Sequence, residues 1–260
     1  ADDVFAVATL SLLLKGKIKI VRTREQKFIS EGDYVVDVGN VYDFSHNRFD
    51  HHQPQTLINA DNRNADKRGW VNGAGARSNG ISYAAFGLVW KHYGEAVAGG
   101  KESAEMIDSS LVQFVDSFDN GVGEIKPVFG TVLPFTIGDI IENMNPTGVS
   151  NPSDFDKAFQ RGVSMAIQII WEAISVAKEK IVSRTAVELA YRLASDKRII
   201  ILDGIYSWYD ILKKYPEPLF VVEPDYKNDN GETNWQLRCV RDNPNTFVNR
   251  KDLPAEWAGK

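Results

Sequence analysis

The order of apolar and polar residues predicts alternating helices and strands in the first half of the chain. Apolar residues recur at helical spacing over residues 2–14. Residues 17–21 and 33–38 then have the pattern of strands. The second of these is almost entirely apolar, as expected for a strand that is buried on both faces of a parallel sheet. This pattern predicts an α/β fold.

Two further helices and a long polar segment follow. Residues 81–92 and 104–118 each place their apolar side chains on one helix face. Residues 53–80 are rich in Asn, Asp, Gly and Arg, which predicts a long loop. Loops of this length usually serve a function or move.

The second half of the chain has a different pattern. Residues 155–193 carry apolar side chains at intervals of three, four and seven, which predicts one long helix. Three later segments have the pattern of strands: 198–202, 219–223 and 235–240. A stretch rich in Asn, Pro and Gly near residues 145–153 is typical of a linker. We therefore expect an α/β domain over residues 1–145 and a smaller α+β domain over residues 150–260.

Composition excludes several classes of protein. Of the 260 residues, 43% are hydrophobic and 25% are charged, which is ordinary globular usage. The net charge of −5 excludes a strongly basic surface for nucleic acid. No apolar run is long enough to span a membrane. The single Cys239 excludes an internal disulfide and fits a reducing compartment without establishing one. We expect an intracellular, cytoplasmic protein, and the sequence leaves the organelle open.

The segment Asp50-His51-His52 is the most informative one in the chain. The chain has four histidines, and three of them, His46, His51 and His52, lie close together in the sequence. Adjacent histidines behind an aspartate suit a metal site, because neutral imidazole is a common metal ligand and a nearby carboxylate fixes its tautomer. A solvated polar turn is an equally good interpretation of the spacing alone.

Asp37 closes the predicted apolar strand, directly before Val38 and Gly39. Sites in open α/β sheets form beyond the carboxyl ends of the strands. A carboxylate that ends a buried strand costs free energy unless it is paired or binds a metal. We therefore favour a functional role for Asp37 over the alternative of a helix or turn cap.

Two more acidic pairs are candidates. Asp116 and Asp119 are three residues apart and share a helix face. Asp119 lies at the helix end, where a carboxylate opposes the helix dipole and indicates a cation nearby. Asp2 and Asp3 lie in the first turn of the first predicted helix. Taken alone, the first pair is better explained as a solvated helix end and the second as N-terminal capping.

Taken in order, these segments resemble the melanocyte-proliferating-gene-one exonuclease family of the DHH phosphoesterase superfamily. The resemblance is carried by ADD at 1–3, VVDVGNVYD at 35–43, HNRFDHHQ at 46–53 and VDSFDNG at 115–121. SYAAFGLVWKHYG at 82–94 also resembles a family stretch, so the resemblance covers essentially the whole chain. It implies a DHH-type parallel-sheet catalytic domain over 1–145 and a substrate-binding domain over 150–260.

The resemblance also implies the cofactors, two Mn²⁺ or Mg²⁺ ions per site that activate water for attack on a phosphodiester. Asp37 matches the aspartate that usually bridges the two ions, and Asp2 matches the carboxylate of the first motif. One of Asp116 and Asp119 matches the last metal ligand. The sequence D-N-G favours Asp119.

The DHH segment itself receives three roles from the resemblance. His51 matches a metal ligand. His52 matches the residue that faces the substrate phosphate, and Asp50 matches a residue that supports the histidines. Asp37, Asp50 and His52 are therefore the expected catalytic residues.

The chain departs from the family pattern at both ends. The histidines of the first motif would precede Ala1, and relatives continue beyond residue 260. We therefore expect a trimmed version of a longer protein, whose activity is in doubt if the molecule truly starts at Ala1.

Basic and polar residues near the expected site are candidates for phosphate contact. Arg22 and Arg24 follow the predicted strand 17–21, and Ser82 and Gly87 lie near a helix start. Solvated surface charge and helix packing are the alternatives. Four cations of the long loop are candidates for guiding a nucleic-acid strand beside Trp70, with a mobile polar loop as the alternative: Arg63, Lys67, Arg68 and Arg77.

The resulting hypothesis is a metal-dependent phosphodiesterase, a 3′–5′ exonuclease on RNA or short oligonucleotides. A pyrophosphatase or small-nucleotide phosphatase with the same site is one alternative. A catalytically impaired interaction protein is the other. The sequence leaves open whether the chain forms a homo-oligomer.

Overall fold

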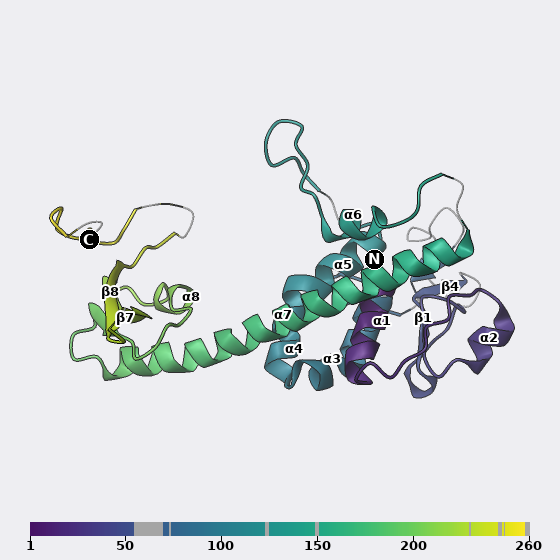
Figure 1. Cartoon of the computed structure of the whole chain (residues 1–260), viewed down its shortest axis with the longest axis horizontal. Coiled ribbons are helices and arrows are strands. Elements are labelled where there is room, and N and C mark those ends of the chain that lie inside the picture. Colours follow the sequence, from purple (N-terminus) through teal and green to yellow (C-terminus); the bar gives the residue numbers. More distant parts are fainter. Residues whose placement is uncertain are drawn as a thin grey trace. The chain divides into compact units, whose positions relative to one another are not determined.

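The computed structural model describes residues 1–54, 70–72, 74–122, 125–148, 151–228, 230–243, 246 and 248–257 (Figure 1). The chain divides into two compact units, residues 1–174 and 175–260. The long helix α7, Pro152–Leu193, contributes residues to both units and confirms the helix expected there. The assignment of residues 1–145 to catalysis and of residues 150–260 to substrate binding stays a prediction.

Helices dominate the first unit. In chain order these are α1 (Asp2–Leu13), α2 (Gln26–Glu31), α3 (Ala85–Ala98), α4 (Lys101–Ile107), α5 (Gln113–Asp119) and α6 (Ile137–Glu142). A π-helical turn, Asp108–Val112, joins α4 to α5 without a break. The helix expected over 104–118 is therefore present, with one irregular turn inside it.

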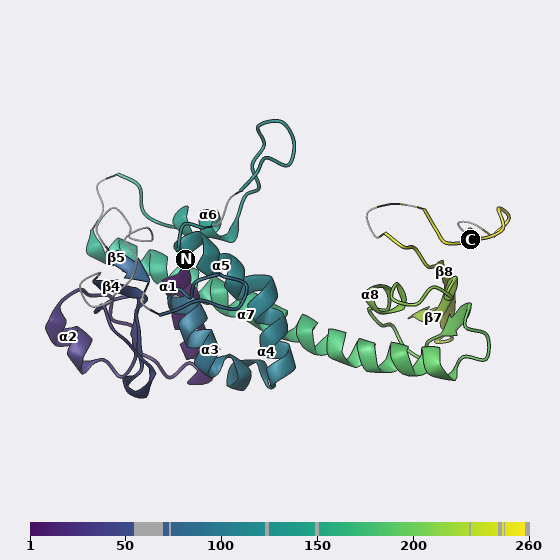
Figure 2. The same cartoon turned by 180° about the vertical axis from the view of Figure 1, so that it is seen from behind.

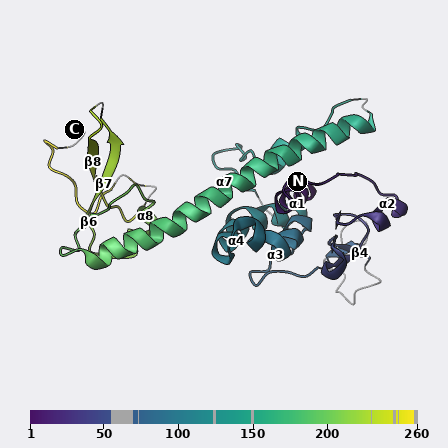
Figure 3. The same ribbon diagram turned by 60° about the horizontal axis from the view of Figure 1, so that its bottom comes forward.

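Helix α1 lies between α3 and the first part of α7 (Figures 2 and 3). Phe5 of α1 is fully buried and stacks on Phe86 of α3, with ring centroids 5.1 Å apart. On the other side, a Cβ at Gly162 of α7 would lie 3.3 Å from Val4. Burial of these apolar side chains stabilises the N-terminal helix against its two neighbours.

The strands of the first unit are short. They are β1 (Val35–Val36), β2 (Tyr42–Asp43), β3 (Arg48–Phe49), β4 (His52–Pro54) and β5 (Trp70–Asn72). The first three form a mixed sheet in the order β1-β3-β2, in which β1 and β3 are parallel. Strands β4 and β5 form an antiparallel pair. A 3₁₀ turn, Phe44–His46, links β2 to β3.

The strand expected over residues 17–21 is wrong. These residues adopt no regular structure, and Val21 is 57% exposed. Alternating apolar residues form a strand only where a neighbouring strand takes up their backbone hydrogen bonds, and the described residues supply no such neighbour. The α/β class is confirmed in the coarser sense of a mixed α/β protein with small sheets.

The second unit is a three-stranded sheet packed on helices. Strand β6 (Ile199–Ile201) pairs in parallel with β7 (Phe220–Lys227), which pairs antiparallel with β8 (Thr233–Cys239). Ile200 and Val221 are fully buried in a core shared with Val187 of α7 and Leu212 of α8 (Tyr209–Leu212). The three strands expected in this part are confirmed.

Among the described residues, no helix combines the length and the apolar character needed to cross a membrane. The 42-residue helix α7 is long enough. Even so, it does not meet this condition.

Candidate metal centre

Two paired parallel strands place Asp37 and the DHH segment side by side at their carboxyl ends. Strand β1 pairs with β3 so that Val36 lies opposite Phe49, and the N–H of Asp37 donates to the carbonyl of Phe49 over 3.1 Å. Asp37 and Asp50 are the next residues along the two strands. The carboxyl ends of neighbouring parallel strands therefore place Asp37 beside the DHH segment.

The chain turns sharply after Asp37. Asp37 and Asn40 have left-handed backbone conformations, with φ of 56° and 61°, and Gly39 has φ of 92°. Asp and Asn tolerate this conformation better than most residues with a side chain. The backbone strain is held by a hydrogen bond from the Asn40 N–H to Oδ2 of Asp50 over 2.7 Å. Such strain persists only where surrounding contacts fix it, which is common at functional sites.

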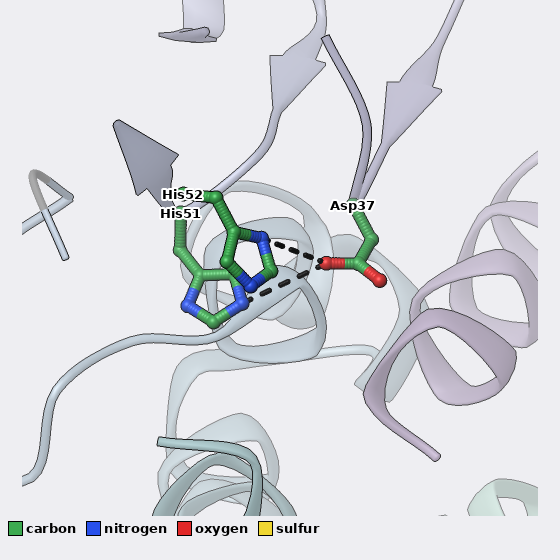
Figure 4. A group of neighbouring side chains, drawn as sticks. All are labelled: Asp37, His51 and His52. Atoms are coloured by element: carbon green, nitrogen blue, oxygen red, sulfur yellow. Dashed lines mark ion pairs between the residues drawn. The ribbon is translucent and has the colours of Figure 1, made fainter. Parts of the chain in front are cut away.

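Both histidines of the DHH segment point toward Asp37 (Figure 4). Oδ1 of Asp37 lies 3.6 Å from Nε2 of His51 and 3.4 Å from Nδ1 of His52. Nε2 of His51 lies 3.0 Å from Oδ2 of Asp119, at the end of α5. His51 therefore stands between carboxylates from β1 and α5.

Two overlapping groups of side chains are arranged to hold a cation. Asp37, His51 and His52 form one group, and Asp2, His51 and Asp119 form the other. Within each group the ligand atoms all lie within 4.8 Å of one another. His51 is common to both groups, so the candidate site is one continuous cluster.

The electrostatics of this cluster favour a positive charge. Burial, together with the charges of Asp37 and Asp119, raises the pKa of Asp2 well above its ordinary value. Burial opposes the charged form of His51, but the carboxylates of Asp119 and Asp37 outweigh it and raise the pKa of His51 to about 10. Burial also acts against ionised Asp119, yet pairing with His51 lowers its pKa. In the absence of a metal, protons neutralise the excess of carboxylates.

The donor set fits a divalent cation. Oδ1 of Asp37 is buried, and no described residue donates a hydrogen bond of normal geometry to it. A buried carboxylate oxygen without a donor is costly unless a cation lies beside it. Carboxylate oxygens with one or two imidazoles suit Mn²⁺, and carboxylates also suit Mg²⁺. This chemistry tolerates either metal that the resemblance implied.

Asp50 fixes the orientation of the DHH segment through hydrogen bonds. Its side chain is almost fully buried, at 1% exposure. Oδ1 accepts the backbone N–H of His52 over 2.9 Å and lies 2.9 Å from Nδ1 of the same histidine. These hydrogen bonds outweigh burial and lower the pKa of Asp50. The contact fixes the orientation of the His52 ring.

Asp116 lies outside both groups of the described cluster. It is fully buried, accepts the N–H of Gly87 over 2.9 Å, and lies 2.7 Å from Nη1 of Arg77. Burial raises the pKa of Asp116 to about 6 although Arg77 acts in the opposite direction. The helix periodicity that grouped Asp116 with Asp119 holds, but the two carboxylates have different partners.

The expected substrate contacts lie in three different settings. Arg22 pairs with Asp156 of α7 over 3.2 Å, and its guanidinium lies 4.9 Å from the ring centroid of Phe159. Arg24 is exposed. Ser82 precedes α3 and offers its carbonyl to the side chain of Asn120 over 3.2 Å.

Of the predicted loop cations, Arg63, Lys67 and Arg68 lie outside the described residues. Arg77 is contradicted both as a candidate guide for nucleic acid and as a cation of a mobile polar loop, because its side chain is 7% exposed and forms ion pairs with Asp108 and Asp116. For Gly87, the alternative of helix packing holds in place of phosphate contact, because its N–H donates to the buried carboxylate of Asp116. Charge and spacing alone did not reveal these internal partners.

Two contributors were not singled out from the sequence. Asn40 supplies the N–H that binds Asp50, and Asp108 shares Arg77 with Asp116. A glycine inside a helical pattern, Gly87, was the one available signal of a close approach, because such a glycine usually has a packing or functional reason.

The whole chain matches a single family of proteins. The family model MYG1_exonuc, described as Uncharacterised protein family (UPF0160), matches residues 1–260. The MYG1 protein of Dictyostelium discoideum is 28% identical over 290 residues, which cover 100% of this chain and 81% of that protein. The MYG1 exonuclease of Homo sapiens is 26% identical over 283 residues, which cover 99% of this chain and 72% of that protein.

The similarity extends to bacteria. The MYG1 protein of Chlamydia muridarum is 30% identical over 171 residues, which cover 65% of this chain and 49% of that protein. No solved structure matches the chain. The family that the order of the motifs suggested is confirmed by a match over the full length, and the chain belongs to the MYG1 exonuclease family.

Proposed function

We propose that this protein is a metal-dependent phosphodiesterase of the DHH type, a 3′–5′ exonuclease that acts on RNA or short oligonucleotides. The single observation that carries the proposal is the convergence of Asp2, Asp37, His51 and Asp119, from four separate segments, on one cluster of metal-ligand atoms. Relatives that match nearly all of this chain are named exonucleases, which supports the same reaction class.

Four residues would hold the first ion: Asp2, Asp37, His51 and Asp119. Asp37, which also lies beside His52, would help to hold the second ion. When bound, such cations lower the pKa of water and neutralise charge on a phosphate. The proposed pair is Mn²⁺ or Mg²⁺. In this proposal Asp119 is the metal ligand from α5, while Asp116 binds Arg77 and the N–H of Gly87 and so anchors α5 to α3.

The chain's own residues would then position the phosphodiester. His52 would donate to a phosphate oxygen, and Asp50 would keep its ring in the correct orientation. Arg22, Arg24 and Ser82 are the proposed contacts to the rest of the nucleotide chain, and residues 150–260 are the proposed substrate-binding domain. A cluster with an excess of carboxylates can accept a polyanion only when cations are present, so RNA binding should depend on the metal.

Degradation of an oligoribonucleotide by the full chain tests this proposal. A 5′-labelled oligonucleotide with Mn²⁺ should be shortened stepwise from its 3′ end, and EDTA should stop the reaction. The same preparation should be tested against pyrophosphate and cyclic dinucleotides. Cleavage of these small compounds with no cleavage of the oligonucleotide would replace the exonuclease by a small-molecule phosphatase. No cleavage of any of these compounds would favour the alternative that the protein is catalytically impaired and acts by binding a partner.

A further inference from the structure

A buried arginine links the π-helical turn before α5 to α5 itself, the helix that carries Asp119. Arg77 binds Asp108 with two nitrogens, Nη2 to Oδ1 over 2.7 Å and Nε to Oδ2 over 3.1 Å. Its Nη1 donates to Oδ2 of Asp116 over 2.7 Å. The guanidinium also lies 4.3 Å from the ring centroid of Tyr83. Arg77 is therefore held on three sides, with 7% of its side chain exposed.

The π-helical turn makes this bridge geometrically feasible. In an ideal helix with 3.6 residues per turn, Asp108 and Asp116 would point about 80° apart. The N–H of Gln113 instead donates to the carbonyl of Asp108, which is the i+5 bond of a π-turn. The extra residue in the turn takes up the misalignment, so both carboxylates face Arg77. Such π-turns are frequent at functional sites.

The same alignment determines the direction of Asp119. Asp116 follows the π-turn and is fixed twice, by Arg77 and by the N–H of Gly87 in the first turn of α3. Asp119 lies three residues further along the same helix. Its Oδ2 reaches Nε2 of His51 over 3.0 Å. A rotation of α5 would move Asp116 off Gly87 and Asp119 off His51 together.

We propose that Arg77 is a positioning residue for the metal centre: by bridging Asp108 and Asp116 across the π-turn, it fixes the rotation of α5 and thereby places Asp119 beside His51. This inference rests on the proposed function, because it gives Asp119 the role of a metal ligand. Arg77 pairs with Asp108 and Asp116, and neither of these carboxylates belongs to the two metal-ligand groups.

Two substitutions of different severity test the proposal in the full chain. Arg77→Lys keeps the charge but cannot bind both oxygens of Asp108 while reaching Asp116, and Arg77→Gln removes the charge. We expect the dissociation constant for Mn²⁺ to rise about 10-fold or more in Arg77→Gln and by less in Arg77→Lys. The d–d absorption of bound Co²⁺ should change in the same order. Arg192→Gln, an arginine that is 74% exposed on α7, is the matched control and should leave both signals unchanged.

The measurements should be made at a temperature at which far-UV circular dichroism shows every variant folded. If Arg77→Gln does not fold, Asp108→Asn removes the same bridge more mildly and should weaken Mn²⁺ binding in the same direction. A variant that loses thermal stability but keeps the wild-type Mn²⁺ affinity and Co²⁺ spectrum would overturn the proposal, because Arg77 would then be structural only.

A crystal structure of metal-free Arg77→Gln separates this inference from the proposed function. We expect the distance from Asp119 Oδ2 to His51 Nε2 to increase beyond 3.0 Å. An unchanged distance would refute the positioning role whether or not the wild type cleaves RNA. Conversely, a wild type that binds Mn²⁺ but cleaves no RNA would refute the proposed function and leave the role of Arg77 standing.

Discussion

Nε2 of His51 lies 3.0 Å from Oδ2 of Asp119, although one residue follows a short strand and the other ends a helix far along the chain. This contact joins the sheet half of the first unit to its helical half at the candidate metal centre. Asp37 and Asp2 approach the same imidazole from other elements. Substitution of any of these residues should therefore change the affinity of the site for a metal ion.

Removing the carboxylate of Asp37 should abolish turnover and leave the fold largely intact. Asp37 has φ of 56°, where asparagine is tolerated better than alanine. Asp37→Asn therefore tests the charge, and Asp37→Ala adds the backbone cost of about 1 kcal/mol. Activity on the oligonucleotide should fall to background in both variants, with far-UV circular dichroism unchanged. Retained activity in Asp37→Asn would remove Asp37 from the mechanism.

Substituting Asp50 should impair activity through His52. An asparagine has one acceptor oxygen in place of two, so it cannot accept both the Asn40 and the His52 N–H groups. We expect Asp50→Asn to lower kcat about 10- to 100-fold. Asp43→Asn, at a partly exposed aspartate paired with His46, is the matched control and should stay within twofold of the wild type. Equal losses in the two variants would argue against a specific role for Asp50.

Gly87→Ala should destabilise the protein. A Cβ at this position would lie 1.8 Å from Oδ2 of Asp116, so the buried carboxylate would have to move. We expect the free energy of unfolding to fall by about 1–3 kcal/mol in urea denaturation. Gly138→Ala, in α6, is the control, because its nearest atom is Thr136 Oγ1 at 3.4 Å. It should be neutral or stabilising by up to about 1 kcal/mol. Similar effects at both glycines would contradict the close packing of Asp116 on α3.

Metal should stabilise the protein more as the pH rises. With the pKa of His51 raised from 6.5 to about 10, the ion pairs of its imidazolium contribute stability that is complete below pH 6.5 and is lost as the pH rises through about 10. A bound cation replaces that proton, so its contribution grows over the same range. The difference in Tm between Mn²⁺-loaded and EDTA-treated protein should increase between about pH 6.5 and about pH 9. A constant or shrinking difference would show that His51 does not exchange a proton for the metal.

The sequence predicted which of these side chains come together better than it predicted the sheet. Spacing alone explained Asp119 as a solvated helix end and left the DHH segment open between a metal site and a polar turn. The order of the motifs linked both to Asp37, and the three side chains do lie in one cluster. The strand expected over residues 17–21 failed because a strand needs a neighbour, and apolar alternation does not supply one.

The partners of Asp116 and Arg77 were beyond the reach of the sequence for a different reason. A buried ion pair between residues of distant segments leaves no periodic signal, so Arg77 resembled a surface cation of a polar loop. The π-helical turn that aligns Asp108 with Asp116 also leaves no signal in the sequence, because its residues continue the helical pattern of the segments on both sides. Only the fold brings these groups together.

X-ray diffraction near the manganese absorption edge, from crystals of the full chain grown with Mn²⁺, tests the central claim most directly. We expect an anomalous peak among Asp37, His51 and Asp119, within bonding distance of their oxygen and nitrogen atoms. A map without such a peak, or a structure in which these three side chains point away from one another, would contradict the metal centre and the nuclease activity derived from it.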